Sequence, residues 1–460
     1  MESYDFVVIG SGPAGEGAAM MAAKHHKSVA VVERHFEVGG GCTHWGTIPS
    51  KALRHAVKTV NDLRANPLLR EYRRNLQLTF PQLLGSADGV VAKQVAQRRR
   101  YYERNKVPVI EGSAHFLDAH TIEVRRTSGA PLKLHGKHII LATGSRPYHP
   151  PEVDFSHPRI KDSDSILRYT DNPLSITIYG AGVIGCEYAS IFANLGLKVT
   201  LVNTQERLLS FLDEEIAEAL SYHLREQGCI IRHNEQFDSI EAREHDVVLN
   251  LKSDRKIKSD VLLWANGRTG NSDALTLDKA GLNANSRGQI AVNAQYQTTV
   301  PHIYAVGDLT GPPALASVAY DQGRWAVEHI LTGHSDALRT DLMPTGIYTL
   351  PEISCVGKTE RELREAKIPF EMGHAGFKSL ARAQMTDETV GMLKILFHAE
   401  TLAILGVHCF GNRASEIVHI GQTAMASGSN LRYFINTTFN YPTMAEAYRV
   451  AAHNGLNRLA

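Results

Sequence analysis

Cysteine is scarce in this sequence and widely scattered. The 460 residues include five, with no C-x-x-C pair and no cluster at metal-ligand spacing: Cys42, Cys186, Cys229, Cys355 and Cys409. This pattern argues against a secreted disulfide scaffold and against a metal site, and it fits a reducing cytoplasm. All but Cys42 are expected to be small buried hydrophobes.

Charge excess and long apolar runs are missing as well. The 49 Lys and Arg are balanced by 48 Asp and Glu, which argues against nucleic acid or a membrane surface as the main partner. No run approaches the roughly 18–20 apolar residues of a membrane span. Met1 leads within three residues into a strand pattern, so we expect no signal peptide and a cytoplasmic location.

A glycine-rich turn follows the first apolar run. Residues 4–9 predict a buried parallel strand, and Gly10, Gly12 and Gly15 follow it. In dinucleotide-binding units these glycines allow the tight turn, the approach of a pyrophosphate and close helix packing. The helix N-terminus supplies partial positive charge for the phosphates. Glu33, 18 residues after Gly15, is expected to bind ribose hydroxyls, and a plain turn is the alternative.

A second unit of the same kind lies about 170 residues further on. Residues 175–179 predict a strand, and Gly180, Gly182 and Gly185 form the turn before the next helix. Two complete fingerprints are stronger than either alone. They predict two dinucleotide sites.

The next strand of the second unit, predicted over residues 198–202, ends at Asn203 instead of an acid. A carboxylate there favours NAD, since it repels the 2′-phosphate of NADP by roughly 3 kcal/mol for unit charges ~5 Å apart at a dielectric of ~20. Asn203 lacks that charge, and Arg207 could add a positive one. We therefore predict that both NAD(H) and NADP(H) bind; the alternative is an ordinary loop Asn and a surface Arg.

Two further stretches are informative. Gly307 and Asp308 follow an apolar strand, so the acid can bind polyol hydroxyls or cap a helix. Residues 82–106 predict one long helix with a basic run at 98–104. That run is expected to be a solvated face, with contact to a phosphate or a partner as the alternative.

Taken in order, these motifs resemble the FAD-dependent pyridine nucleotide-disulfide oxidoreductases over nearly the whole chain. The resemblance includes residues 39–51, where the family carries two cysteines five positions apart. Here Cys42 is present, but the partner position is Thr47, which cannot form a disulfide. The family's His before Pro442 is Tyr441, although Glu446 remains; a tyrosine, with a pKa near 10, is a poor base at neutral pH.

The resemblance implies FAD on the first turn, with Ala114 near its adenine and Asp308 near its ribityl chain. It implies NAD(P) on the second turn and an ion pair of Lys51 with Glu187 beside the flavin. These two are the expected catalytic residues. The other residues that it places at the cofactors are Gly40, Gly41, Cys42, Thr47, Thr143, Gly144, Gly267, Gly307 and Ala316.

The same resemblance implies an α/β fold with two Rossmann-like domains and a C-terminal α+β interface domain. The expected ranges are 1–150 and 271–340 for FAD, 151–270 for NAD(P), and 341–460 for an interface that makes at least a homodimer.

Residues 39–47, 265–271 and 439–446 resemble the soluble pyridine nucleotide transhydrogenases within the family. They imply reversible hydride transfer between NADPH and NAD⁺ through FAD, without a dithiol. The alternatives are an NAD(P)H oxidase or peroxidase that uses Cys42, and a non-catalytic flavoprotein sensor or scaffold.

Overall fold

The first sheet contains six strands from residues 2–141 and a seventh from residues 303–305. The computed structural model describes residues 1–66, 68, 78–335 and 340–459. The sheet order is β3-β2-β1-β6-β5-β4, with β17 paired to β6. Its strands are β1 (Glu2–Ile9), β2 (Val29–Glu33), β3 (Val109–Glu111), β4 (Ser113–Phe116), β5 (Thr121–Arg125), β6 (Leu132–Leu141) and β17 (Ile303–Ala305).

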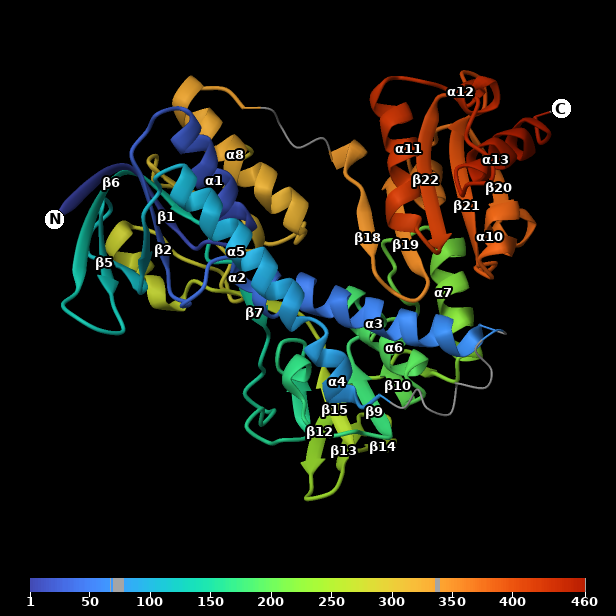
Figure 1. The fold of residues 1–460 in the computed structure, drawn as a ribbon, viewed down its shortest axis with the longest axis horizontal. Coiled ribbons are helices and arrows are strands. Elements are labelled where there is room, and N and C mark those ends of the chain that lie inside the picture. The colour runs from blue at the N-terminus through green and yellow to red at the C-terminus, as the bar shows by residue number, and fades with distance from the viewer. Residues whose placement is uncertain (67, 69–77, 336–339, 460) are drawn as a thin grey trace.

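Parallel pairing in this sheet places several chain turns at one edge. β1 pairs in parallel with β2 and β6, and β17 pairs in parallel with β6, so their carboxyl ends meet there. The helices of this domain are α1 (Pro13–Lys24), α2 (Gly40–His44), α3 (Thr47–Ala65), α4 (Phe80–Gly85), α5 (Asp88–Arg104) and α8 (Ala316–Thr332). Helices α1 and α8 lie side by side on one part of the domain (Figure 1).

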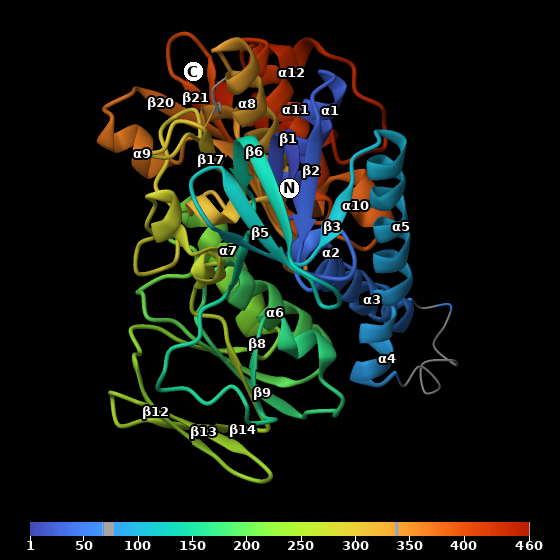
Figure 2. The same cartoon turned by 90° about the vertical axis from the view of Figure 1, so that its left-hand side faces the viewer.

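The second domain repeats the parallel arrangement in the order β11-β10-β9-β15-β8. Its elements are β8 (Ile160–Asp162), β9 (Ser175–Tyr179), α6 (Val183–Asn194), β10 (Lys198–Val202), α7 (Glu214–Glu226), β11 (Ile230–Arg232) and β15 (Val261–Trp264). An antiparallel layer of β12 (Phe237–Ala242), β13 (Val247–Leu251) and β14 (Lys256–Ser259) lies at one end of the molecule (Figure 2). The short strands β7 (Ser145–Pro147) and β16 (Arg268–Gly270) pair between the first two domains.

The third domain is an antiparallel sheet covered by helices. The strand order is β18-β19-β22-β21-β20. The strands are β18 (Thr345–Ile347), β19 (Glu352–Gly357), β20 (Phe370–Gly376), β21 (Gly391–His398) and β22 (Ile404–Gly411). The helices are α9 (Glu360–Glu365), α10 (Ala381–Met385), α11 (Ala414–Ala426), α12 (Arg432–Asn436) and α13 (Glu446–Leu456).

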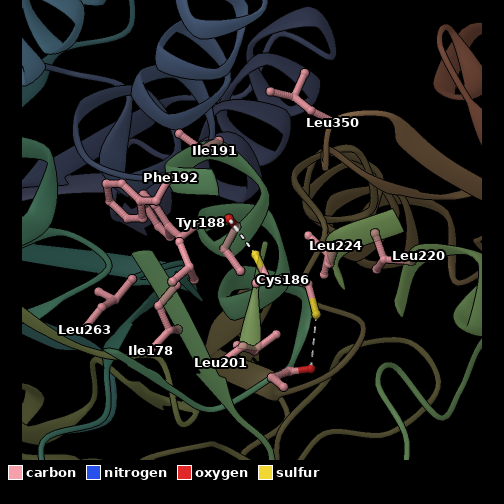
Figure 3. Packing of buried hydrophobic residues seen from close by; sticks show 14 of the residues in the cluster. Ile178, Cys186, Tyr188, Ile191, Phe192, Leu201, Leu220, Leu224, Leu263 and Leu350 are labelled. Atoms are coloured by element: carbon pink, nitrogen blue, oxygen red, sulfur yellow. Dashed lines mark hydrogen bonds between the residues drawn. The ribbon is translucent and has the colours of Figure 1, made fainter. Parts of the chain in front are cut away.

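Helix α3 joins the three domains. It runs from the first domain across the middle of the molecule (Figure 1). Asn61 Nδ2 donates to the carbonyl of Asn194 in α6 at 3.0 Å, and Arg54 Nε donates to the carbonyl of Thr349 at 2.9 Å. The second and third domains also share a core beneath α6, because Leu350 of the third domain belongs to the same buried cluster as Cys186 and Phe192 (Figure 3).

The structure confirms the expected fold class of two Rossmann-like domains and a C-terminal α+β domain. The exact domain limits stay a prediction, and residues 336–339, next to the predicted limit at 340, lie outside the described residues. None of the described helices is both long and apolar enough to cross a membrane.

The long helix expected over residues 82–106 is two helices, α4 and α5. The expectation of a solvated basic face is wrong for Arg98, which is buried and pairs with Glu16 at 3.2 Å. Spacing along a helix shows which residues share a face, but a buried acid on another helix turns one arginine of the run inward.

Candidate functional site

A cavity of about 670 Å³ extends from the carboxyl edge of the first sheet toward the other two domains. That volume lies within the range of small-molecule sites. The predicted residues that line it are Gly10, Gly12, Glu33, Gly40, Gly41, Cys42, Thr47, Lys51, Ala114, Thr143, Gly144, Glu187, Gly307, Asp308 and Ala316. The other predicted residues lie off its walls: Gly15, Gly180, Gly182, Gly185, Asn203, Arg207 and Gly267.

In the first glycine turn, two glycines are required by close backbone contacts and a third leaves space for a ligand. Gly10 has a φ of 107°, and a Cβ there would lie 2.3 Å from the carbonyl oxygen of Ala142. A Cβ on Gly15 would lie 1.8 Å from the carbonyl oxygen of Gly10, so α1 packs against the strand. At Gly12 the nearest neighbour is 3.8 Å away. The opening at Gly12, at the N-terminus of α1, fits a pyrophosphate.

Two acids and one hydroxyl complete this part of the cavity. Glu33 is buried and accepts hydrogen bonds from the backbone N–H and the hydroxyl of Ser11, at 2.9 and 2.6 Å. Asp308 accepts one from Ser145 Oγ at 2.7 Å. The hydroxyl of Thr143 is buried without a hydrogen-bond partner among the described residues. Acceptors at the sheet edge and an unpaired hydroxyl fit a polyol-bearing dinucleotide such as FAD.

The cysteine segment holds a single thiol at the cavity. Cys42 lies in α2 and Thr47 begins α3. Burial raises the pKa of the Cys42 thiol, and a hydrogen bond to the Thr47 side chain lowers it by less. The five cysteines, all within the described part of the chain, are free thiols. A buried thiol with a raised pKa is a weak nucleophile at neutral pH.

Lys51 and Glu187 come together from two domains at this cavity. Lys51 Nζ of α3 lies 2.7 Å from Glu187 Oε2 of α6. Their side chains are 27% and 9% exposed, so the lysine is the partner that faces open space.

Tyr348 of the third domain joins this pair, and sequence reasoning missed it. Its backbone N–H donates to Glu187 Oε1 at 2.8 Å, and its ring centroid lies 5.0 Å from Lys51 Nζ. The three residues are separated by more than 130 positions in the chain, so no local pattern could have indicated Tyr348.

Arg268, Asn271 and Asp164 also line the cavity and were not predicted individually. Asn271 Nδ2 donates to the carbonyl of Thr143 at 3.0 Å, and Arg268 Nε donates to Ser145 Oγ at 2.8 Å. Burial raises the pKa of Asp164 to about 6, although the positive charge of Arg268 lowers it.

The second glycine turn repeats the geometry of the first. Gly180 has a φ of 104°, and a Cβ on Gly185 would lie 1.8 Å from its carbonyl oxygen. A Cβ on Gly182 would meet nothing within 4 Å. The helix that follows reaches the cavity through Val183, Ile184 and Glu187. A nucleotide on this turn therefore has a direct path along α6 into the cavity.

Asn203 and Arg207 lie at the end of β10 but are both engaged within the protein. Asn203 is buried, and its Nδ2 donates to the carbonyls of Gln205 and Arg207, each at 2.9 Å. Arg207 is exposed and lies 2.6 Å from Glu214. Gly267 lies apart, with its carbonyl accepting from the Tyr148 N–H at 3.0 Å. Direct ribose contacts from these residues stay a prediction.

Comparison with known families decides where this arrangement belongs. The pyridine nucleotide-disulphide oxidoreductase model matches residues 4–323, and the model of that family's dimerisation domain matches residues 343–452. The chain belongs to the pyridine nucleotide-disulphide oxidoreductases. This confirms the resemblance stated from the motifs.

Relatives within this family are similar over their whole length. The soluble pyridine nucleotide transhydrogenase of Pectobacterium atrosepticum is 58% identical over 459 residues, which is 99% of this chain and 98% of that protein. The protein of the same name from Salmonella typhimurium is 56% identical over the same shares.

Solved structures of this oxidoreductase family agree with the fold. The HOCl-induced flavoprotein disulfide reductase RclA from Escherichia coli superimposes with a TM-score of 0.89 at 28% identity, covering 98% of this chain and 99% of that one. LpdA from Mycobacterium tuberculosis superimposes with a TM-score of 0.90 at 25% identity over the same shares.

Within the pyridine nucleotide-disulphide oxidoreductases, this chain departs at the disulfide itself. Thr47 stands five residues after Cys42, and both line the cavity. Tyr441 is 72% exposed on the third domain, and the Oε2 atom of Glu446 is buried without a hydrogen-bond partner among the described residues. The cavity therefore keeps the family's surroundings without its dithiol.

Proposed function

We propose that this protein is a soluble pyridine nucleotide transhydrogenase, which catalyses NADPH + NAD⁺ ⇌ NADP⁺ + NADH. The observation that carries the proposal is a family cavity with one buried thiol instead of two. Since Thr47 prevents an internal disulfide, electrons have no thiol acceptor within the described site. FAD, when bound in this cavity, supplies an acceptor and donor of hydride that serves both nicotinamide nucleotides.

The residues of the chain bind and orient the partners. The first glycine turn would hold the FAD pyrophosphate, Glu33 and Asp308 would accept hydrogen bonds from its sugar hydroxyls, and Ala114 would border the adenine. The second glycine turn holds the nucleotide substrate, and α6 guides it toward the cavity. Because each nucleotide needs the same turn, the two substrates bind in succession and not together.

Lys51 and Glu187 set the charge at the reacting end. Glu187 holds the ammonium of Lys51 in place, and Tyr348 holds Glu187 through its backbone N–H. A fixed positive charge in a partly buried site stabilises negative charge that develops beside it. This assigns the catalytic role to Lys51 and a positioning role to Glu187.

We also propose a homodimer or larger homo-oligomer through the third domain and a cytoplasmic location. The match to the family's dimerisation domain supports the first. The scattered free thiols support the second.

A matched pair of variants tests the function. Cys42→Ser should keep the rate of hydride transfer from NADPH to a thionicotinamide analogue of NAD⁺ within about threefold. Lys51→Gln should lower kcat by about 10²-fold, because it removes the fixed charge. Initial rates at several fixed concentrations of the second nucleotide should give parallel double-reciprocal lines.

Two results would overturn the proposal. One is an intersecting pattern, which requires both nucleotides on the protein at once. The other is oxygen or peroxide consumption that exceeds hydride transfer and disappears in Cys42→Ser, which would identify an NAD(P)H oxidase or peroxidase.

A further inference from the structure

Three consecutive acids begin helix α7, and they serve two different partners. Asp213 and Glu215 both contact Lys394 of β21, at 2.8 and 3.1 Å, and the side chain of Lys394 is 2% exposed. Glu214, between them, pairs with Arg207 at 2.6 Å. Glu214 therefore faces the loop that follows β10, residues 203–212, which we call the nucleotide loop. Asp213 and Glu215 hold the helix to the third domain.

Arg207 lies in the loop after the second strand of the nucleotide unit, the region in which a 2′-phosphate is expected. In a dinucleotide unit the end of the second strand approaches the adenosine ribose. Here β10 ends at Val202, and the Asn203 amide donates to the carbonyls of Gln205 and Arg207. This bonding curls the loop and keeps Arg207 beside the strand end. Asn203 thus organises the loop that presents the cation.

Glu214 is held in position and cannot simply move away from the loop. Leu220 and Leu224 of the same helix are fully buried in the core beneath α6 (Figure 3). The Lys394 contacts fix the first turn of the helix from the other side. The helix N-terminus also favours a negative charge at Glu214.

We propose that Glu214 is a specificity-determining residue that competes with the 2′-phosphate of NADP(H) for Arg207. The side chains of Arg207 and Glu214 are 47% and 48% exposed, and such pairs are weak enough for a phosphate to break. The displaced carboxylate stays close and repels the phosphate, which offsets part of the attraction of Arg207. The ion pair thereby reduces the difference in affinity between NADP(H) and NAD(H). This inference rests on the proposed function, in which one site serves both nucleotides.

Fragments of the nucleotides test this without any hydride transfer. Titration calorimetry on the FAD-loaded protein would compare 2′,5′-ADP, which carries the phosphate, with 5′-AMP, which does not. Glu214→Gln should bind 2′,5′-ADP about three- to tenfold more tightly, since one repulsive charge is lost, with 5′-AMP unchanged. Arg207→Gln should weaken 2′,5′-ADP alone. The gain from Glu214→Gln should be smaller in the double variant, because only the repulsion by the carboxylate is relieved there and no competition for Arg207 remains.

Glu226→Gln is the matched control. It is exposed at the far end of α7, three turns from Glu214, and removes the same charge. It should change the affinity for either fragment by less than about twofold. An equal gain in Glu226→Gln would show a general charge effect and overturn the assignment to Glu214.

The inference is also wrong if Glu214→Gln leaves 2′,5′-ADP binding unchanged, or if the gain is as large without Arg207 as with it. Those outcomes leave transhydrogenation itself intact. Conversely, failed hydride transfer together with the predicted fragment affinities would overturn the proposed function and not the role of Glu214.

Discussion

At the scale of single residues, Asp164 shows how strongly burial at the cavity shifts the pKa of a carboxyl group. Burial raises its pKa from 3.8 to about 6, although Arg268 lies 3.8 Å away and lowers it. The folded protein therefore holds the proton more tightly than the unfolded chain does. As pH rises from about 4 to about 6, the unfolded chain loses this proton first, so the folded state becomes less stable relative to it.

Asp164→Asn should remove this cost. We expect the variant to have a higher Tm than the wild type at pH 7.5, with a gain in unfolding free energy of up to about 3 kcal/mol. Below about pH 3 the two proteins should unfold at nearly the same temperature, because the wild-type carboxyl is then largely protonated in both states. Scanning calorimetry across this pH range measures the difference.

Asp278→Asn, at an exposed position, is the control and should shift Tm at neither pH. A constant difference between wild type and Asp164→Asn over the whole range would contradict the titration and indicate a packing effect.

What the sequence could predict of the site also depends on the residue. Gly12 and Gly182 follow from a local pattern, because the backbone itself sets their geometry. Lys51 and Glu187 are 136 positions apart and came from the resemblance alone. The engagement of the Asn203 amide with its own loop was not predictable, because a strand-end position does not show whether a side chain bonds to the loop or to a ligand.

At the scale of elements, each glycine turn contains a glycine that the fold requires and another that ligand binding requires. Strands at residues 175–179 and 198–202 were predicted with the bounds that β9 and β10 have. Short apolar runs and glycine turns determine such elements locally. The split between α4 and α5 was missed, because Thr79 caps α4 through a capping box with Gln82 and the helix ends at Gly85.

Gly182→Ala should affect nucleotide binding, whereas Gly185→Ala should affect stability. Gly182 has a φ of −74°, and a Cβ there meets nothing within 4 Å, so Tm should change little. The added methyl group would occupy the space of the pyrophosphate, and the KM for both NADH and NADPH should rise by about tenfold or more.

Gly185→Ala should instead destabilise the fold, since its Cβ would lie 1.8 Å from the carbonyl oxygen of Gly180. Thermal unfolding and steady-state kinetics on both variants measure this contrast. A stable Gly182→Ala protein with unchanged KM for both nucleotides would show that this turn does not bind them.

At the scale of the whole molecule, the nucleotide loop is tied to the third domain. Lys394 of β21 contacts Asp213 and Glu215 of α7 and Glu360 of α9, with the Glu360 contact at 2.5 Å. Although burial raises it, the charges of His408 and Lys394 hold the pKa of Asp213 below its usual value. This cluster joins the element that carries Glu214 to the domain that carries Tyr348.

Lys394→Met should weaken that junction, because it leaves three carboxylates facing one another around a buried position. Loss of one partner from a buried ion pair costs about 3–5 kcal/mol, so Tm at pH 7 should fall by several degrees. Lys358→Met, exposed in the same domain, should not. Asp213 gives its stabilisation above its unfolded pKa and loses it as pH falls, so the difference between wild type and Lys394→Met should shrink below about pH 4. A Tm difference that does not change with pH would mean that the lysine acts by packing alone, and the tie between the nucleotide loop and the third domain would then not be electrostatic.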